Sequence, residues 1–199
     1  RDVEIDDAGD VYLLTGFFNQ VTPTSAMDIE LFKFNPSGTQ LWKKDFDFGS
    51  TDFPTRFTYV AGKLSIIGES MGGGFDWITF QTDTDGNMLW NTRYNGAPLN
   101  DEAPYFIAAK ANGEVFVTGK GGPNVDPNNV PSLRMITLKY SNTGVQTWVD
   151  STNYYNGWGY GCTLASDGSL FALSGTNMTV YHFLDYTGSG SCNIPTGLN

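Results

Sequence analysis

The amino-acid sequence predicts an all-β protein, a β-propeller assembled from four-stranded antiparallel blades. Turn glycines recur along the chain at intervals of 53, 51 and 55 residues, which marks a structural repeat. Glycine (24 residues) and aromatic side chains (15%) are abundant while charged residues make up only 16%, a composition typical of turn-rich β-structure. No stretch has the period of a long amphipathic helix, and no apolar run approaches the ~20 residues that span a bilayer.

Each repeat opens with a hairpin whose turn contains a glycine. The turn sequences are DAGD, VAGK, ANGE and SDGS, with glycines at Gly9, Gly62, Gly113 and Gly168. Asn112-Gly113 between two apolar runs is a strong hairpin signal, because both turn positions tolerate positive φ. The strand after each turn ends at a further glycine, namely Gly16, Gly68, Gly119 and Gly175. We therefore predict two paired strands at the start of every repeat, with these four glycines in a structural role.

A third and a fourth strand complete each repeat. The third strands are LFKF, ITFQT, ITLKY and VYHFL, and they lead to second turns at glycines 38, 86, 144 and 188. Their apolar residues occupy both registers, which predicts a sheet buried on both faces, as when blades stack around an axis. In three repeats a tryptophan follows four residues after the second turn glycine: Trp42, Trp90 and Trp148. We expect these tryptophans on the outer strand, wedged between adjacent blades.

The repeats predict blade boundaries at 1–49, 50–100, 101–156 and 157–187. Residues 188–199 are predicted to be a linker, and their end, IPTGLN, is similar to the start of a fibronectin type III module. Propellers usually close with roughly four to eight blades, and units this long are more usual in the larger rings. We expect about four blades of a larger ring, with a closed four-bladed ring as the alternative.

Charge and cysteine content restrict the partners. A net charge of −10 and a pI near 4.3 exclude the basic footprint that nucleic-acid binding requires, and they disfavour anionic membranes. Cations, neutral glycans and proteins stay open as partners. Cys162 and Cys192 are the two cysteines, and the sequence is equally compatible with one disulfide, which suits an exported protein, and with two free thiols.

The stretch from Trp90 to Gly119, together with ITLKYSNTGVQTW, resembles the bacterial β-propeller repeats known as SBBP repeats. The shared pattern is W-x-x-x-Y-x-G, then N-D-E-A, an apolar strand and N-G-E-V-F-V-T-G. The resemblance implies a secreted or surface-exposed bacterial protein, often multidomain, with fibronectin-like modules and a C-terminal domain for type IX secretion. Its motifs specify turns and packing, so no catalytic residue is carried over from it.

Binding residues are predicted on one face of the disc. In a four-stranded blade the connections between strands 2 and 3 and those between blades share a face, and here these connections vary in length and carry acidic and aromatic residues. Our candidate binding residues are Tyr94, Asp101, Glu102, Tyr154, Tyr155 and Trp158. The competing interpretation is that these side chains pack beneath neighbouring loops.

Signals for metal or acid–base chemistry are weak. His182, the only histidine, is expected at a core or blade-interface position, in the register of Phe32, Phe80 and Leu138 counted back from the turn glycine. Asp83-Thr-Asp-Gly-Asn and Asp6-Asp-Ala-Gly-Asp lack the twelve-residue ligand spacing of an EF-hand, so we predict turn chemistry there. We predict no cofactor; calcium held jointly by neighbouring loops is the alternative.

These observations favour a non-catalytic extracellular propeller that binds proteins or glycans within a larger bacterial surface or secreted protein. The alternative is a hydrolase or lyase acting on polysaccharide, with carboxylates such as Asp101-Glu102 or Asp45 and Asp47. A quinone-dependent dehydrogenase is a third hypothesis, and no adjacent cysteine pair supports it.

Overall fold

The computed structural model describes residues 1–19, 26–49, 51–72, 74–96, 102–121, 134–151, 158–175 and 179–183. These residues form fifteen strands, and the all-β prediction is confirmed. Within these ranges no helix is long and apolar enough to cross a membrane.

The strands form four antiparallel sheets in which sequential strands are neighbours. Blade 1 contains β1 (Asp2–Ile5), β2 (Val11–Asn19), β3 (Ala26–Phe34) and β4 (Gln40–Phe46). Blade 2 contains β5 (Asp52–Val60), β6 (Lys63–Met71), β7 (Phe75–Asp83) and β8 (Met88–Tyr94). Blade 3 contains β9 (Ala103–Ala109), β10 (Val115–Gly121), β11 (Arg134–Tyr140) and β12 (Gln146–Ser151). The described part of blade 4 contains β13 (Gly159–Leu164), β14 (Leu170–Ser174) and β15 (Thr179–Phe183).

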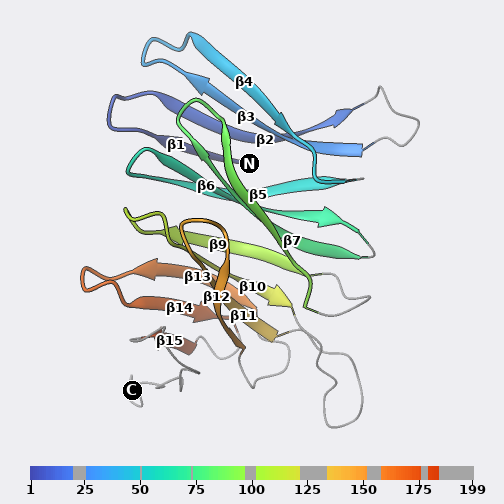
Figure 1. The fold of residues 1–199 in the computed structure, drawn as a ribbon, viewed down its shortest axis with the longest axis vertical. Helices are drawn as coiled ribbons and strands as arrows, with labels where there is room; N and C mark the ends of the chain where they lie inside the picture. Colours follow the sequence, from blue (N-terminus) through green and yellow to red (C-terminus); the bar gives the residue numbers. More distant parts are fainter. Residues whose placement is uncertain are drawn as a thin grey trace.

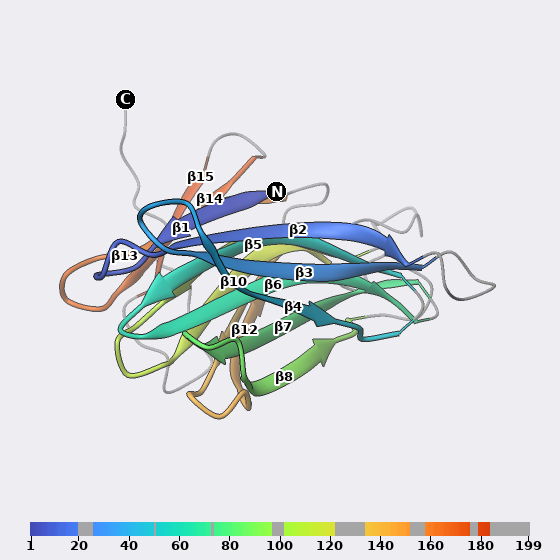
Figure 2. The same ribbon diagram turned by 90° about the horizontal axis from the view of Figure 1, so that it is seen from above.

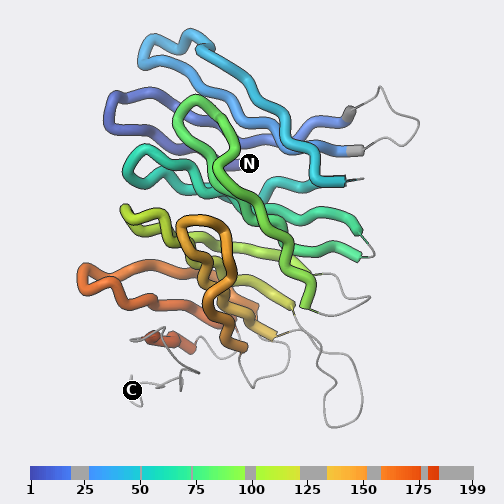
Figure 3. Tube along the Cα trace, in the orientation of Figure 1, coloured from blue at the N-terminus to red at the C-terminus, as the bar shows by residue number. Residues whose placement is uncertain are grey.

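The four sheets stack in chain order, from blade 1 in blue to blade 4 in orange and red (Figures 1 and 2). The first strands lie side by side along this stack, because β1 contacts β5, β5 contacts β9, and β9 contacts β13. They form the inner edge of the propeller. The first hairpin turns of all four blades lie together on the left in Figure 3, and we call this side the turn face. The opposite side, where the second strands end, is the loop face.

The turns have the geometry that their glycines predict. All seven described turn glycines have positive φ, between 74° and 91°. Aspartate completes several of these turns: the Asp83 carboxylate accepts hydrogen bonds from the N–H of Asp85 (2.9 Å) and of Asn87 (2.8 Å). The two aspartate-rich segments are therefore turns, as predicted, because their oxygens are used by their own backbone.

The hydrophobic cores lie between blades rather than within them. One cluster joins blades 1 and 2, with Leu14 and Leu31 against Ile66 and Phe80. A second joins blades 2 and 3, and a third joins blades 3 and 4. Strand β7 is buried along almost its whole length on both faces, as the two-register apolar pattern predicts. Each sheet is therefore stabilised by its neighbours on either side.

The tryptophans of the fourth strands pack against glycines of the next blade. The Trp90 ring lies against Gly144, where an added Cβ would be 2.7 Å from the indole. Trp42 is placed in the same way against Gly86, with its ring 3.2 Å from the position of a Cβ. Trp148 meets Phe183 of blade 4, with ring centroids 5.0 Å apart. These second-turn glycines thus provide both the positive φ and the space for an indole ring.

A β-bulge in the first strand explains Gly68 and Gly119, which lie within β6 and β10 and not at their ends as the sequence predicted. In blades 2, 3 and 4 the pairing of the first two strands shifts by one residue, which leaves Thr55, Tyr105 and Tyr160 without a cross-strand partner. The bulged backbone approaches the second strand so closely that a Cβ on Gly119 would lie 2.1 Å from the carbonyl oxygen of Ala103. In blades 2 and 3 only glycine fits at this point of the second strand, whereas in blade 4 Ser174 is paired with a glycine of the first strand, Gly159.

Blade 1 directs an apolar sheet face away from blade 2. Val3 and Ile5 on this face are 58% and 61% exposed, and Leu13, the partner of Val3, is also exposed. The equivalent pair in blade 2, Phe57 and Ile66, is buried against blade 1. Blade 1 therefore has the side chains of a blade–blade interface on a face that the described part of the chain leaves uncovered.

The predicted register of His182 is wrong by one residue. His182 pairs with Phe171, as Lys139 pairs with Phe116 in blade 3. The position expected for it is taken by Tyr181, which packs in the core between blades 3 and 4. The segment between this strand and its turn glycine is one residue longer than in the other repeats, so counting back from that glycine gave the opposite face of the sheet.

The bulge makes a substitution test possible. We expect Gly119→Ala to lower the free energy of unfolding by at least about 3 kcal/mol, because its Cβ would overlap backbone atoms that cannot move independently. Gly161→Ala is the matched control, since the nearest atom to its Cβ is Leu173 Cβ at 3.8 Å, an ordinary contact. Urea unfolding of both variants measures the difference, and equal losses would contradict the steric explanation.

Asp6 provides a pH-dependent contribution to stability. Its carboxylate accepts hydrogen bonds from the N–H groups of Ala8 and Asp10 and from the Tyr12 hydroxyl, all within 3.0 Å. Burial alone would raise the pKa of Asp6, but the Asp10, Tyr12 and Ala8 hydrogen bonds outweigh it, and the pKa lies below the ordinary value of 3.8. The lowered pKa means that this stabilisation is present above the unfolded value and is lost as pH falls through the folded one.

We therefore expect Asp6→Ala to cost about 2 kcal/mol at neutral pH, because it leaves the turn donors without an acceptor. The difference between wild type and Asp6→Ala should shrink as the pH is lowered below 3.8, the unperturbed pKa of the group. Chemical unfolding at several pH values measures it. A difference that is the same at neutral and at acid pH would contradict the ionic origin of this contribution.

Candidate functional site

Two of the bulged residues, half-buried Tyr105 and exposed Tyr160, belong to a group of aromatic rings on the loop face. Tyr105 and Tyr160 occupy the same position in blades 3 and 4, and their rings stack with centroids 6.3 Å apart and planes 14° apart. Trp158 completes the group, 6.3 Å from Tyr105 and 6.1 Å from Tyr160. Trp158 is 38% exposed and Tyr160 is 48% exposed. We call Tyr105, Trp158 and Tyr160 the aromatic patch.

The backbone around the patch holds the rings in place. The carbonyl oxygen of Trp158 accepts a hydrogen bond from the N–H of Gly175 at 2.9 Å. The Tyr160 ring lies directly over Gly175, where a Cβ would be 2.1 Å from the ring. Gly175, which directly follows β14, therefore supports the patch, because any side chain there would displace the tyrosine ring.

Charged groups of both signs border the patch. The Lys120 ammonium lies 5.7 Å from the centre of the Trp158 ring, within the range of a cation–π contact. Burial raises the pKa of Tyr105 to about 12. The Glu69 carboxylate and the neighbouring Tyr160 raise this pKa further. The Tyr105 hydroxyl is therefore neutral at physiological pH and can donate a hydrogen bond. The patch thus offers apolar ring faces next to hydrogen-bonding groups.

The predicted binding residues fall into three groups: one lies in the aromatic patch, two are packed against other residues, and three lie outside the described residues. Trp158 lies in the patch, whereas Glu102 is fully buried and its carboxylate accepts a hydrogen bond from the N–H of Gly96 at 2.8 Å. Tyr94 packs on Trp77, and burial together with the Glu102 charge raises its pKa to about 12. Tyr94 and Glu102 therefore contact residues of blade 2 and do not form an exposed binding surface. Asp101, Tyr154 and Tyr155 lie outside the described residues.

The sequence analysis did not select Tyr105 or Tyr160: it assigned Tyr105 to an apolar strand, and Tyr160 to a connection from which other residues were chosen. The signal that could have found them is their place in the repeat: both lie near the start of a first strand, in β9 and β13, and are matched by Thr55 in β5. An extra residue opposite an obligatory glycine indicates a bulge, and bulges often direct side chains toward functional sites.

Three aspartates converge on the loop face between blades 1 and 2. One carboxylate oxygen from each of Asp28, Asp47 and Asp52 lies within 4.8 Å of the others, and we call these residues the acidic cluster. Asp28 lies on β3, Asp47 follows β4, and Asp52 begins β5. Burial raises the pKa of Asp52, and the charge of Asp47 raises it further.

The proposed Asp45 and Asp47 pair is separated by its contacts. Asp45 forms an ion pair with Lys43 at 3.2 Å, whereas Asp47 belongs to the acidic cluster. Side chains two residues apart on a strand point the same way, but Asp47 lies just beyond the end of β4. The two carboxylates therefore have different partners.

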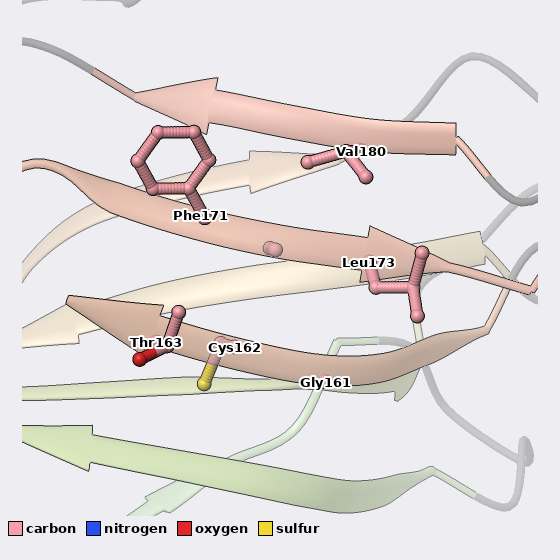
Figure 4. Close-up of a pocket in the computed structure, with 7 residues that line it drawn as sticks. Gly161, Cys162, Thr163, Phe171, Leu173 and Val180 are labelled. Carbon is pink, nitrogen blue, oxygen red and sulfur yellow. The ribbon is translucent and has the colours of Figure 1, made fainter. Parts of the chain in front are cut away.

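An apolar groove of about 270 Å³ lies on blade 4. Figure 4 shows Phe171, Leu173 and Val180 along this face, while the Cys162 sulfur points toward the neighbouring blade. The face is the one that blade 3 buries through Phe116, the equivalent of Phe171. We assign the groove to blade packing rather than to ligand binding, because it has the chemistry of a sheet interface.

Cys162 packs against the core between blades 3 and 4, and burial raises the pKa of its thiol to about 12. Cys192, the other half of the disulfide considered from the sequence, lies outside the described residues. His182, on the groove side of the sheet, stacks on Phe171 with ring centroids 4.1 Å apart.

No protein-family model and no curated protein sequence matches the chain. Among solved structures, similarity is found to a catalytically inactive virginiamycin B lyase from Staphylococcus aureus with quinupristin, at TM-score 0.41 and 15% identity over 98% of this chain and 70% of that one. A predicted 6-phosphogluconolactonase from Bacteroides uniformis matches at TM-score 0.42 and 11% identity, over 100% of this chain and 72% of that one. A chimera of ACO and RPE65 matches at TM-score 0.43 and 13% identity, and 88% of this chain covers 46% of its length. These values are too low to carry a functional inference.

Proposed function

We propose that this chain is a carbohydrate-binding propeller module that contacts a neutral polysaccharide through the aromatic patch. The observation that carries the proposal is the convergence of Tyr105, Trp158 and Tyr160 on one exposed surface of the loop face. Two of the three rings are presented by bulges, which are positions where the fold redirects a side chain.

The chemistry of the patch suits a sugar chain. Sugar rings present C–H groups on one face and hydroxyls around the edge, so they pack on aromatic faces and bond to polar groups at the rim. Tyr105 supplies a hydroxyl beside the rings, and Lys120 supplies donors. Tyrosine and tryptophan lose little conformational entropy on binding, which suits a preformed surface. A net charge of −10 disfavours polyanionic chains, and a neutral glycan avoids this repulsion.

We place the module in a secreted or surface-exposed bacterial protein, as part of a longer polypeptide. The resemblance of its repeats to SBBP repeats and the low lysine and arginine content (11 residues) support this placement. A partner protein on the loop face is the competing ligand class, and it requires contacts well beyond three rings to reach a stable interface.

A hydrolase or lyase acting on polysaccharide is the alternative function. One observation favours it, the convergence of three carboxylates in the acidic cluster. This cluster is built by blades 1 and 2, however, while the aromatic patch is built by blades 3 and 4. Glycoside hydrolysis needs two carboxyl groups flanking the bound sugar, so a binding role accounts for the patch more directly.

Binding to laminarin, xylan, galactomannan and starch, measured by affinity electrophoresis and calorimetry, tests the proposal. We expect at least one of these polysaccharides to bind, and we expect Trp158→Ala and Tyr160→Ala each to weaken its binding by about tenfold or more. The reason is that each substitution removes a contacting ring without altering a blade core.

Phe18→Ala is the matched control, because Phe18 is 61% exposed at the end of β2 but belongs to blade 1. It should bind like wild type. Failure of the whole panel to bind, or equal binding by wild type and Trp158→Ala, would refute the proposed function. Shortening of the polysaccharide that stops on Asp47→Asn would establish the enzymatic alternative instead.

A further inference from the structure

The acidic cluster concentrates negative charge where the fold buries it. Asp52 is fully buried and Asp28 is 5% exposed, while Asp47 is exposed at the rim. One ligand oxygen of each lies within 4.8 Å of the other two. Buried carboxylates normally have a compensating partner, so this arrangement calls for a positive charge.

One oxygen of the cluster has no hydrogen-bond partner. Asp52 Oδ2 accepts a hydrogen bond from the N–H of Phe48 at 2.6 Å, but Asp52 Oδ1 is buried and accepts none. A buried acceptor without a partner is costly and is uncommon in native structures. This oxygen belongs to Asp52, the fully buried member of the cluster, whereas Asp47 is the exposed member.

The groups around the cluster include one cation, Arg93, whose charge lowers the pKa of Asp52 and partly offsets the effect of burial. The Arg93 guanidinium donates to the carbonyl oxygen of Phe48 (3.0 Å), to Ser70 and to Asp76. Gly49 N–H donates to Asp47 Oδ1 at 2.9 Å. These bonds fix the connection between blades 1 and 2 in the shape that brings Asp47 beside the two buried carboxylates.

We propose that Asp28, Asp47 and Asp52 bind a calcium ion that links blades 1 and 2. Oxygens on opposite sides of a Ca²⁺ ion are about 4.8 Å apart, since each lies ~2.4 Å from the metal, so all three ligand atoms fit within one coordination shell. Hard carboxylate ligands with no histidine or cysteine among them select Ca²⁺ or Mg²⁺ over zinc or copper. Three protein carboxylates favour Ca²⁺, because Mg²⁺ usually retains several waters and takes one or two carboxylates.

The calcium ion would connect three separate elements. Asp28 comes from the third strand of blade 1, Asp47 from the end of its fourth strand, and Asp52 from the first strand of blade 2. A cation at this point ties the outer edge of one blade to the inner edge of the next. Its binding is independent of the aromatic patch, so it can be tested apart from the proposed carbohydrate function.

Calcium titration of the chelator-treated protein tests the site, with thermal unfolding and calorimetry as readouts. We expect the melting temperature to rise by roughly 5–10 °C once free Ca²⁺ is about 100-fold above its dissociation constant. Asp52→Asn should lose this rise, while without calcium it should melt no lower than wild type, because it removes a crowded buried charge. Asp47→Asn, at the exposed rim, should weaken calcium binding by about tenfold or more with no effect on the calcium-free melting temperature.

Asp45→Asn is the matched control, since Asp45 pairs with Lys43 outside the cluster and only two residues from Asp47. It should bind calcium like wild type. Absence of a calcium response in wild type, or wild-type calcium affinity in both Asp52→Asn and Asp47→Asn, would overturn the site. An equal response to Mg²⁺ at the same concentration would overturn its assignment to calcium.

Discussion

The structure depends on burying both faces of each four-stranded sheet against its neighbours. No blade has an apolar interior of its own, since the three described core clusters all lie between blades. The contact of Trp90 with Gly144 is one example. Because Gly144 of blade 3 has no side chain, the indole ring of Trp90 of blade 2 fits against it. Stability is therefore shared between neighbouring blades, as in other repeat proteins, and we expect a single isolated blade to be unfolded.

The close packing of strands within a blade also determines where the aromatic patch forms. In blade 3 the bulged first strand passes so close to the second strand that the backbone of Ala103 leaves room only for Gly119. The bulge then releases one side chain from the ladder. Blade 2 places a threonine there, while blades 3 and 4 place tyrosines, and this single difference between repeats produces the aromatic patch. Function of this kind needs no change in the fold, only a change at a position that the packing leaves unconstrained.

The sequence predicted the features that repeat and failed at those that depend on a single deviation. Turn glycines such as Gly113 and Gly144 were recognisable because positive φ and short hairpins limit the residues allowed. The side of the sheet on which His182 lies was not predictable from the repeat, because one inserted residue before a turn moves a side chain to the opposite side. Burial of Glu102 could not be inferred either, since it depends on a hydrogen bond from the N–H of Gly96 that no sequence pattern indicates. The acidic cluster combines residues from three elements, and no spacing within the sequence indicates their proximity.

Blade 1 has a further consequence for the molecule in solution. Repeat proteins that meet water at an end usually carry a capping repeat with a polar outer face. Blade 1 instead presents the apolar side chains of Val3, Ile5 and Leu13 there. In isolation the 199-residue chain therefore exposes an apolar face at blade 1. We expect it to self-associate through this face, to an extent that depends on protein and salt concentration. Grafting a polar capping strand onto that face would be the natural route to a well-behaved monomer.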